Sequence, residues 1–270
     1  MLLEKEIKSI MTAGGSNSLI GISGKIGSGK DTVGSILQYL SCKEYELLNE
    51  DYSFASFLED ENSPYEIKKF AGKLKEIAAL LIGCDVSDFE DREFKEKELG
   101  KEWWKWEISF EGVLEGYIDY LGNEKHYEDE YMIESHLIKL TPRKLLQLLG
   151  TEAGRQVLHP NIWINALFAD YVCDDCGQQE CPTDEEDTGQ MIHYSFPSWI
   201  ITDVRFSNEA KAIKDRGGIM IRIERPEGES HCGGQHASET ALDNYNFDYV
   251  IDNEGSIDEL IEKIKQLKLV

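Results

Sequence analysis

Three glycines and a lysine, placed between an apolar run and a helical pattern, are the residues best suited to bind phosphate. The segment Leu19–Thr32 reads LIGISGKIGSGKDT. Glycine permits positive φ and a close approach of the backbone to a ligand, so successive N–H groups can point at phosphate oxygens. The helix that follows adds the positive end of its dipole. The order of strand, glycine loop, lysine and helix predicts a phosphate-binding loop (P-loop). The predicted contacts are Gly24, Lys25, Gly27, Ser28, Gly29, Lys30, Asp31 and Thr32.

The loop departs from the usual motif at its last position. In G-x-x-x-x-G-K-[ST] a hydroxyl follows the lysine and faces Mg²⁺, whereas here Asp31 follows and Thr32 comes one residue later. A carboxylate is a hard oxygen ligand, so Asp31 and Thr32 are both predicted near magnesium. The negative charge beside a polyphosphate is a cost. The alternative is a glycine-rich turn in which Asp31 is an ordinary helix N-cap.

The overall charge restricts the class of partner. The 270 residues include 52 acidic and 28 basic side chains, a net charge of −24. Such a surface repels a nucleic-acid backbone, and an anionic small substrate needs a locally basic cleft. No apolar run reaches membrane-spanning length, and Met1–Asn17 lacks the apolar core of a signal peptide. We therefore predict small-molecule partners, no nucleic acid, no membrane and a cytoplasmic location.

Strand and helix patterns alternate along the chain. Runs of β-branched residues between helices predict a parallel sheet with both faces covered. Predicted strands begin at Leu19 and span Trp199–Thr202, Gly218–Ile223 and Tyr249–Ile251, with Tyr45–Leu48 a further candidate. Predicted helices span about 31–40, 66–82, 141–158, 161–171, 207–216 and 257–267.

We predict an N-terminal extension at 1–18 and one domain at 19–270, with insertions at about 85–140 and 173–196. The first contains Trp103, Trp104 and Trp106, which we interpret as a packing cluster in a segment that covers the core. The second is acidic and contains three cysteines and a histidine. These could close a zinc site, although their spacing fits no common zinc module; the alternative is an exposed loop with free thiols. They are Cys173, Cys176, Cys181 and His193.

Polar residues follow three of the predicted strands. Asp203 and Arg205 follow Trp199–Thr202, Arg222 and Arg225 end the next strand, and Asn253 follows the last. Carboxyl ends of parallel strands are where open α/β sheets bind ligands. The arginines can supply the positive charge that phosphoryl transfer needs, and Asn253 is placed for a base-binding loop. Asp203 could accept a proton, hold Mg²⁺ through water, or orient Lys30. The alternatives are an N-cap of the following helix for Asp203 and surface ion pairs for Arg222 and Arg225.

Two helices carry cationic faces. The helix at 66–82 presents four lysines, which are either a solvated face or include one or two functional groups such as Lys75. On the helix at 141–158, Arg143 and Arg155 lie twelve residues apart. They can both serve one long ligand, or neither. The remaining polar positions that we consider there are Gln147 and Glu152.

Taken together, the motifs resemble those of deoxynucleoside monophosphate kinases of large tailed bacteriophages, P-loop enzymes of the nucleoside monophosphate kinase group. A loop that ends Lys-Asp-Thr is typical of that family. The N-terminal extension, the Trp-rich stretch and the cysteine insertion depart from its pattern. The motifs are GKIGSGKDT (24–32), FAGKLKEIAALLIG (70–83), DREFKE (91–96), TPRKLLQLLGTEAGR (141–155), WIITDVRFSNEA (199–210), RIERP (222–226) and HASE (236–239).

The resemblance implies an α/β fold of the P-loop NTPase type, with helical acceptor-binding or lid insertions. It implies transfer of the γ-phosphoryl group of ATP–Mg²⁺ to a deoxynucleoside 5′-monophosphate, in the host cytoplasm if the protein is viral, and it is compatible with a homodimer. Lys30 and the loop glycines would hold the ATP phosphates. Arg205 and Arg225 would supply charge to the transferring group, with Asp203 beside them. Arg143, Gln147, Glu152 and Arg155 would line the acceptor site.

Two other functions share the phosphate-binding loop. One is another small-molecule P-loop kinase, such as phosphomevalonate kinase, whose loop can also end in Lys-Asp-Thr. The other is an ATP- or GTP-binding regulator with no acceptor. The arginines of the helix at 141–158 favour a kinase, because a switch needs no acceptor site.

Overall fold

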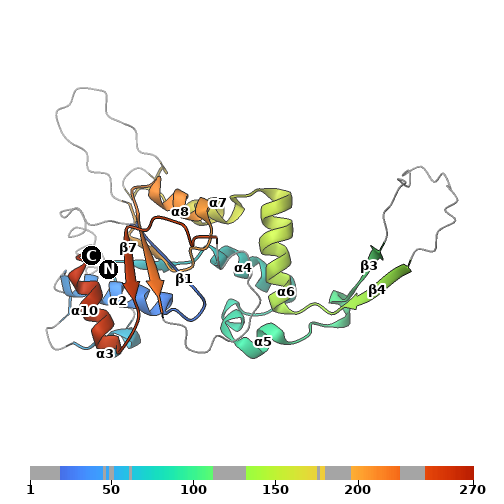
Figure 1. Cartoon of the computed structure of the whole chain (residues 1–270), viewed down its shortest axis with the longest axis horizontal. Helices are drawn as coiled ribbons and strands as arrows, with labels where there is room; N and C mark the ends of the chain where they lie inside the picture. Colours follow the sequence, from blue (N-terminus) through green and yellow to red (C-terminus); the bar gives the residue numbers. More distant parts are fainter. Residues whose placement is uncertain are drawn as a thin grey trace, which may run out of the picture. The chain divides into compact units, whose positions relative to one another are not determined.

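The computed structural model describes residues 19–44, 47–48, 52–60, 63–111, 132–174, 177–179, 196–225 and 241–270 (Figure 1). The chain divides into two compact units, one of residues 1–74 and 154–270 and the other of residues 75–153. The predicted extension at 1–18, the HASE motif and the cysteine-rich segment beyond its first residues lie outside the described ranges.

The larger unit is built on a five-stranded, fully parallel sheet in the order β2-β5-β1-β6-β7. The central strand pairs on one side with β5 and on the other with β6, so Ile20 is opposite both Ile200 and Ile219. This confirms the predicted α/β class. The strands are β1 (Leu19–Gly24), β2 (Glu66–Lys68), β5 (Trp199–Ile201), β6 (Ile219–Glu224) and β7 (Tyr249–Asp252).

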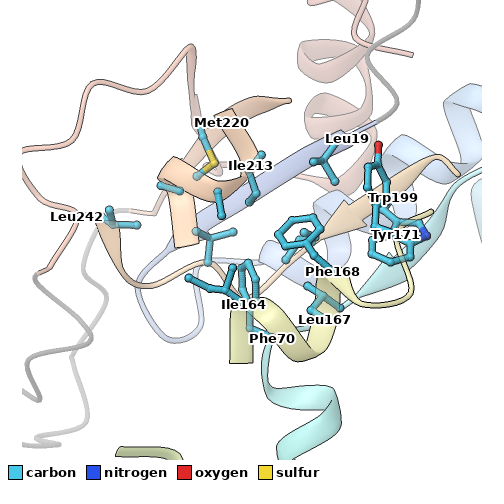
Figure 2. Packing of buried hydrophobic residues seen from close by; sticks show 14 residues of the cluster. Leu19, Phe70, Ile164, Leu167, Phe168, Tyr171, Trp199, Ile213, Met220 and Leu242 are labelled. Atoms are coloured by element: carbon cyan, nitrogen blue, oxygen red, sulfur yellow. The ribbon is translucent and has the colours of Figure 1, made fainter. Parts of the chain in front are cut away.

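Alternate residues of the strands enter two separate cores, as the period of two in a strand requires. On one face Leu19, Trp199 and Met220 pack with residues of α7 (Ile162–Phe168) and α8 (Ser207–Lys214), as Figure 2 shows. On the other face Ile22 and Ile221 pack with α2 (Lys30–Glu44) and α10 (Ile257–Gln266). Helix α3 (Phe54–Asp60) packs against α2. Each fully buried aliphatic or aromatic side chain contributes about 1.5–3 kcal/mol.

The smaller unit has its own apolar core of Ala78, Phe89, Leu140 and Leu145 with their neighbours. The last helix of the smaller unit begins after Thr141. As predicted, Thr141 is its N-cap, and the side chain accepts a hydrogen bond from the backbone amide of Lys144. That helix starts as α-helix and continues as π-helix through Leu158. The elements of the smaller unit are α4 (Ala71–Ile82) from Lys75 onward, η1 (Val86–Glu90), α5 (Arg92–Glu96), η2 (Lys101–Trp103), the antiparallel pair β3 (Lys105–Glu111) and β4 (Met132–Ile138), α6 (Pro142–Gln147) and the start of η3 (Leu148–Leu158).

The predicted helix at 66–82 is wrong at its beginning. Residues Glu66–Lys68 form the edge strand β2, paired with β5, and helix α4 (Ala71–Ile82) begins only after it. The apolar spacing suits a helix throughout, but pairing with β5 extends the first residues, and Asp203 binds the first backbone amides of α4. The described part of the candidate strand at 45–48, Leu47–Leu48, is not a strand. In the described parts of the chain, every helix is too short or too polar to cross a bilayer.

Candidate active site

The loop between β1 and α2 has a backbone that requires glycine at defined positions. Gly29 has φ +93°, and a Cβ there would lie 2.4 Å from Nδ2 of Asn253. Gly24 has no room for a side chain either, since a Cβ would lie 2.5 Å from Oγ of Ser28 and 2.6 Å from the carbonyl oxygen of Ile223. The loop therefore curls tightly against the ends of neighbouring strands, as a phosphate-binding loop must.

Lys30 begins α2 and its side chain folds back over the loop. The ammonium group donates to the carbonyl oxygens of Gly24 at 2.8 Å and Lys25 at 2.7 Å. The amide of Val33 donates to the carbonyl oxygen of Gly29 at 2.9 Å, which joins the loop to the first turn of α2. A cation and a helix N-terminus thus meet at one loop, the combination that attracts a polyphosphate.

Two residues that directly follow β6 and β7 bind the backbone of the loop. Asn253 donates from Nδ2 to the carbonyl oxygen of Ser28 at 2.8 Å, while its backbone amide donates to Glu224 at 2.7 Å. Arg225 donates to the carbonyl oxygen of Gly27 at 3.4 Å. The hydroxyl of Ser28 is buried and has no hydrogen-bond partner among the residues described. Asn253 therefore contacts the backbone of the P-loop, and the base-binding role expected from the sequence stays a prediction.

Asp31 lies in the first turn of α2, one residue inside the helix, so it is not the N-cap. Its Oδ1 accepts a hydrogen bond from the Thr202 hydroxyl at 2.7 Å and pairs with Nζ of Lys69 at 3.0 Å. Burial alone would raise the pKa of Asp31, but the hydrogen bonds from Thr202 and Lys69 and the charges of Lys69 and Lys30 outweigh it and lower the pKa. The Asp31 side chain is thus an ionised, largely exposed carboxylate at the end of the P-loop.

Asp203 caps a helix distant in sequence. Its two oxygens accept from the backbone amides of Phe70 at 2.8 Å and Ala71 at 2.9 Å, at the start of α4. Burial raises the pKa of the Asp203 carboxyl, against the opposing effect of these donors and of the Arg205 charge. Asp203 is not the N-cap of the helix that follows it, because the N-cap position of α8 is Phe206.

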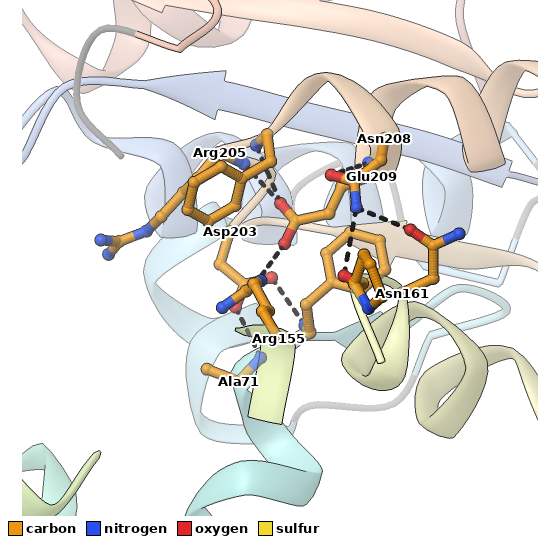
Figure 3. A network of polar contacts seen from close by, with 10 residues as sticks. Ala71, Arg155, Asn161, Asp203, Arg205, Asn208 and Glu209 are labelled. Atoms are coloured by element: carbon orange, nitrogen blue, oxygen red, sulfur yellow. Dashed lines mark hydrogen bonds and ion pairs between the residues drawn. The ribbon is translucent and has the colours of Figure 1, made fainter. Parts of the chain in front are cut away.

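Arg155 is held by a buried carboxylate that the sequence did not single out (Figure 3). Its Nη2 donates to Oε1 of Glu209 at 2.8 Å, and its guanidinium lies 4.5 Å from the ring centre of Phe206. Oε2 of Glu209 accepts from the backbone amides of Arg205 at 2.8 Å and Phe206 at 3.1 Å. Burial is the main reason that the pKa of Glu209 is raised, and the Asp203 charge adds to the rise. In the sequence, the one indication of a role for Glu209 is its position three residues after the helix N-cap, where an acid commonly binds the first backbone amides.

Arg222 and Arg205 have different surroundings. Arg222 is buried, donates to Asp243 at 3.1 Å and lies 5.6 Å from the ring centre of Phe247, so its guanidinium forms a partly buried ion pair. The side chain of Arg205 is exposed, although Glu209 fixes its backbone. Loop 202–206 is joined to β1 by a hydrogen bond from the amide of Val204 to the carbonyl oxygen of Ile22 at 3.2 Å.

The predicted acceptor residues are divided between the two units. Arg155 belongs to the larger unit, and Lys75, Arg143, Gln147 and Glu152 belong to the smaller one. In the smaller unit Lys75 pairs with Glu90, and Arg143 pairs with Glu96.

Two further lysines of the 66–82 segment form ion pairs, and one of the four residues considered for zinc lies in the described part of the chain. Lys73 pairs with Asp170 at 3.4 Å and Lys68 with Glu66 at 2.5 Å, both partly exposed. Cys173 is buried, and the other three zinc candidates lie outside the described residues. Within the described ranges no group of three or more His, Cys, Asp or Glu side chains could hold a metal.

Comparison with known proteins gives a family match. The model of the family described as deoxynucleotide monophosphate kinase matches residues 115–264. The deoxynucleoside-5'-monophosphate kinase of Escherichia phage T5 is 25% identical over 253 residues, which covers 83% of this chain and 84% of that protein. A putative deoxynucleotide monophosphate kinase of Acanthamoeba polyphaga mimivirus is 32% identical over 132 residues, covering 46% of this chain and 59% of that protein. The deoxynucleotide monophosphate kinase of Enterobacteria phage T4 is 27% identical over 123 residues, covering 46% and 43%.

Proposed function

We propose, from the premise that the chain belongs to the deoxynucleotide monophosphate kinase family, that it transfers the γ-phosphoryl group of ATP to a deoxynucleoside 5′-monophosphate. An oxygen of the 5′-phosphate forms a bond to the γ-phosphorus, and the bond between that phosphorus and the β–γ bridging oxygen breaks. The products are ADP and the deoxynucleoside diphosphate. The observation that carries the proposal is the glycine loop closed by Lys30, found at the end of the central strand in a chain of this family.

The donor half rests on the geometry of the P-loop. The loop amides and the ammonium of Lys30 provide positive charge for a polyphosphate. Because Asn253 already holds the loop in place, the amides need little rearrangement when the polyphosphate binds. Arg225, which contacts the carbonyl oxygen of Gly27, is placed to add charge beside the same loop. The proposed ATP contacts are those of loop 24–32, with Asn253 supporting the loop.

Magnesium fits the end of this loop. Mg²⁺ is usually bound by one or two protein oxygens together with substrate phosphates and waters. Asp31 offers an ionised carboxylate, whose Oδ1 is held in place by the Thr202 hydroxyl and by Nζ of Lys69. Asp31 and Thr32 would hold the ion, which when bound would neutralise charge on the β- and γ-phosphates.

The acceptor half rests on cationic side chains. The backbone amide of Arg205 and the guanidinium of Arg155 both bind Glu209. Arg205 lies in the loop after β5, the strand next to β1, which leads into the P-loop. We propose that both face negative charge of the reacting phosphates. For Arg143, Gln147, Glu152 and Lys75 the proposal rests on family resemblance, and the ion pairs of Arg143 and Lys75 would be exchanged for substrate contacts. The carboxylate of Asp203 accepts hydrogen bonds from the backbone amides at the start of α4. We propose that Asp203 takes part in catalysis from this position.

A phosphotransfer assay across acceptors tests the function. ATP consumption coupled to ADP formation would be measured with each common deoxynucleoside and ribonucleoside monophosphate, and with phosphomevalonate. We expect turnover with at least one deoxynucleoside monophosphate and a much lower rate without acceptor. Turnover with phosphomevalonate alone, or slow ATP hydrolysis that no monophosphate changes, would refute the proposal and favour another kinase or a regulator respectively.

A further inference from the structure

The side chain of Glu209 is only 2% exposed, and its carboxylate accepts three hydrogen bonds beside the proposed site. We propose that Glu209 is a positioning residue, which fixes the guanidinium of Arg155 and the backbone of Arg205 so that both cations face the reacting phosphates. This role rests on the proposed function, because it has meaning only if a phosphoryl group is transferred there.

The geometry separates the two tasks of the carboxylate. Oε2 accepts from the amides of Arg205 and Phe206, so it completes the N-terminus of α8. Oε1 accepts from Nη2 of Arg155, whose helix is remote in sequence. One oxygen therefore shapes the loop that carries Arg205, and the other aligns a side chain from η3.

The chemical setting explains why a carboxylate is placed there. Arg155 keeps 23% of its side chain exposed, while its carboxylate partner is almost completely buried. The ring of Phe206 lies against the guanidinium and restricts it further. An arginine side chain loses much rotamer freedom when it binds a ligand, and a partner that orders it beforehand reduces that loss. Glu209 thus pre-organises Arg155 through the hydrogen bond that Nη2 donates.

Replacing Glu209 by glutamine tests the alignment of Arg155 while keeping the hydrogen bonds at the N-terminus of α8. In Glu209→Gln the side-chain carbonyl oxygen can still accept from the two backbone amides. Its amide nitrogen then faces the guanidinium of Arg155, and two donors cannot bond to each other. The variant should keep the N-terminus of α8 and lose the alignment of Arg155.

The test is a double-mutant cycle of Glu209→Gln and Arg155→Ala, with ATP and a deoxynucleoside monophosphate that the wild type accepts. We expect each single variant to lower kcat/KM for the acceptor by about 10- to 100-fold, the range for a charge-assisted hydrogen bond, with little change in KM for ATP. The double variant should be no worse than Arg155→Ala alone, because both changes remove one interaction.

A matched control comes from another partly buried arginine–carboxylate pair of the same unit. Asp243→Asn removes the negative charge that pairs with Arg222, so it should lower stability without a selective effect on the acceptor. If Glu209→Gln melts well below this control, Glu209→Asp replaces it. The shorter acid keeps its charge but cannot both cap α8 and reach Arg155, so the same selective loss is expected.

The outcomes separate the two proposals. Wild-type kinetics for the folded Glu209 variant, or losses that multiply in the double variant, would overturn the role of Glu209 and leave the kinase function standing. A wild-type protein that phosphorylates no deoxynucleoside monophosphate would overturn the function and this role with it.

Discussion

Lys30→Met is the substitution whose consequences for folding and for catalysis differ most. The two side chains are similar in length, so the change mainly removes the ammonium group. In the folded protein that group donates to two carbonyl oxygens, those of Gly24 and Lys25. Both belong to a partly exposed loop, so water can replace the lost donor at either oxygen.

The magnitudes follow from these contacts. A net loss of about 1 kcal/mol for each of these two hydrogen bonds, at oxygens that water can reach, gives a cost to stability of about 2 kcal/mol. A cost of that size lowers the melting temperature of a chain this long by at most about 8 °C. Loss of a charged donor that stabilises the transferring phosphoryl group typically lowers kcat by about 10²- to 10³-fold, or about 3–4 kcal/mol. The effect on kcat should therefore exceed the effect on folding.

The assay is steady-state phosphotransfer at 25 °C, with thermal unfolding measured on the same preparation. Lys43→Met, at the opposite end of α2, is the matched control because it removes a lysine from the same helix away from the loop. We expect the control to keep kcat within about threefold of wild type, a range far smaller than the loss predicted for Lys30→Met. Lys30→Met with kcat equally close to wild type would refute the assignment of Lys30 to the phosphates.

Three further variants test separate parts of the structure. Asn253→Ala should raise KM for ATP several-fold with little change in KM for the acceptor, because the carbonyl oxygen of Ser28 loses its donor; equal changes in both constants would contradict a local role. The pKa of Asp31 is lowered from 3.8 in the folded state, so its contribution to stability is present above that pH and lost as pH falls. Acid unfolding of Asp31→Asn should thus depend less steeply on pH below about 4 than that of wild type, and identical acid limbs would argue against the ion pair. Phe168→Ala should cost about 3–5 kcal/mol in urea unfolding, because the ring is buried in the core of Figure 2, and a cost below about 1 kcal/mol would be inconsistent with that packing.

Features that depend on neighbouring residues in the chain could be predicted from the sequence. The β1–loop–α2 unit, the cap at Thr141 and the alternation of buried strands with helices all follow from local propensity and periodicity. The carboxyl ends of the strands correctly suggested where Arg205 and Arg225 lie. Local patterns are informative here because turns, caps and strand faces are formed by adjacent residues.

Features that depend on distant pairing could not be predicted in this way. The strand Glu66–Lys68 has helical spacing and becomes a strand only because β5 lies beside it. Asn253 supports the loop through a carbonyl more than two hundred residues away, at Ser28. Glu209 reads as an ordinary capping acid, and only the fold brings Arg155 to it. A single sequence contains no signal for such contacts.

The central claim is that the amides of loop 24–32, with Lys30, enclose the polyphosphate of ATP. Amide hydrogen exchange of the wild-type chain, with and without magnesium and a non-hydrolysable ATP analogue, measures this directly. The account predicts slower exchange in peptides that cover residues 24–32 and no change in the peptide that covers α10. Saturating nucleotide that leaves exchange in the loop unaltered would contradict it.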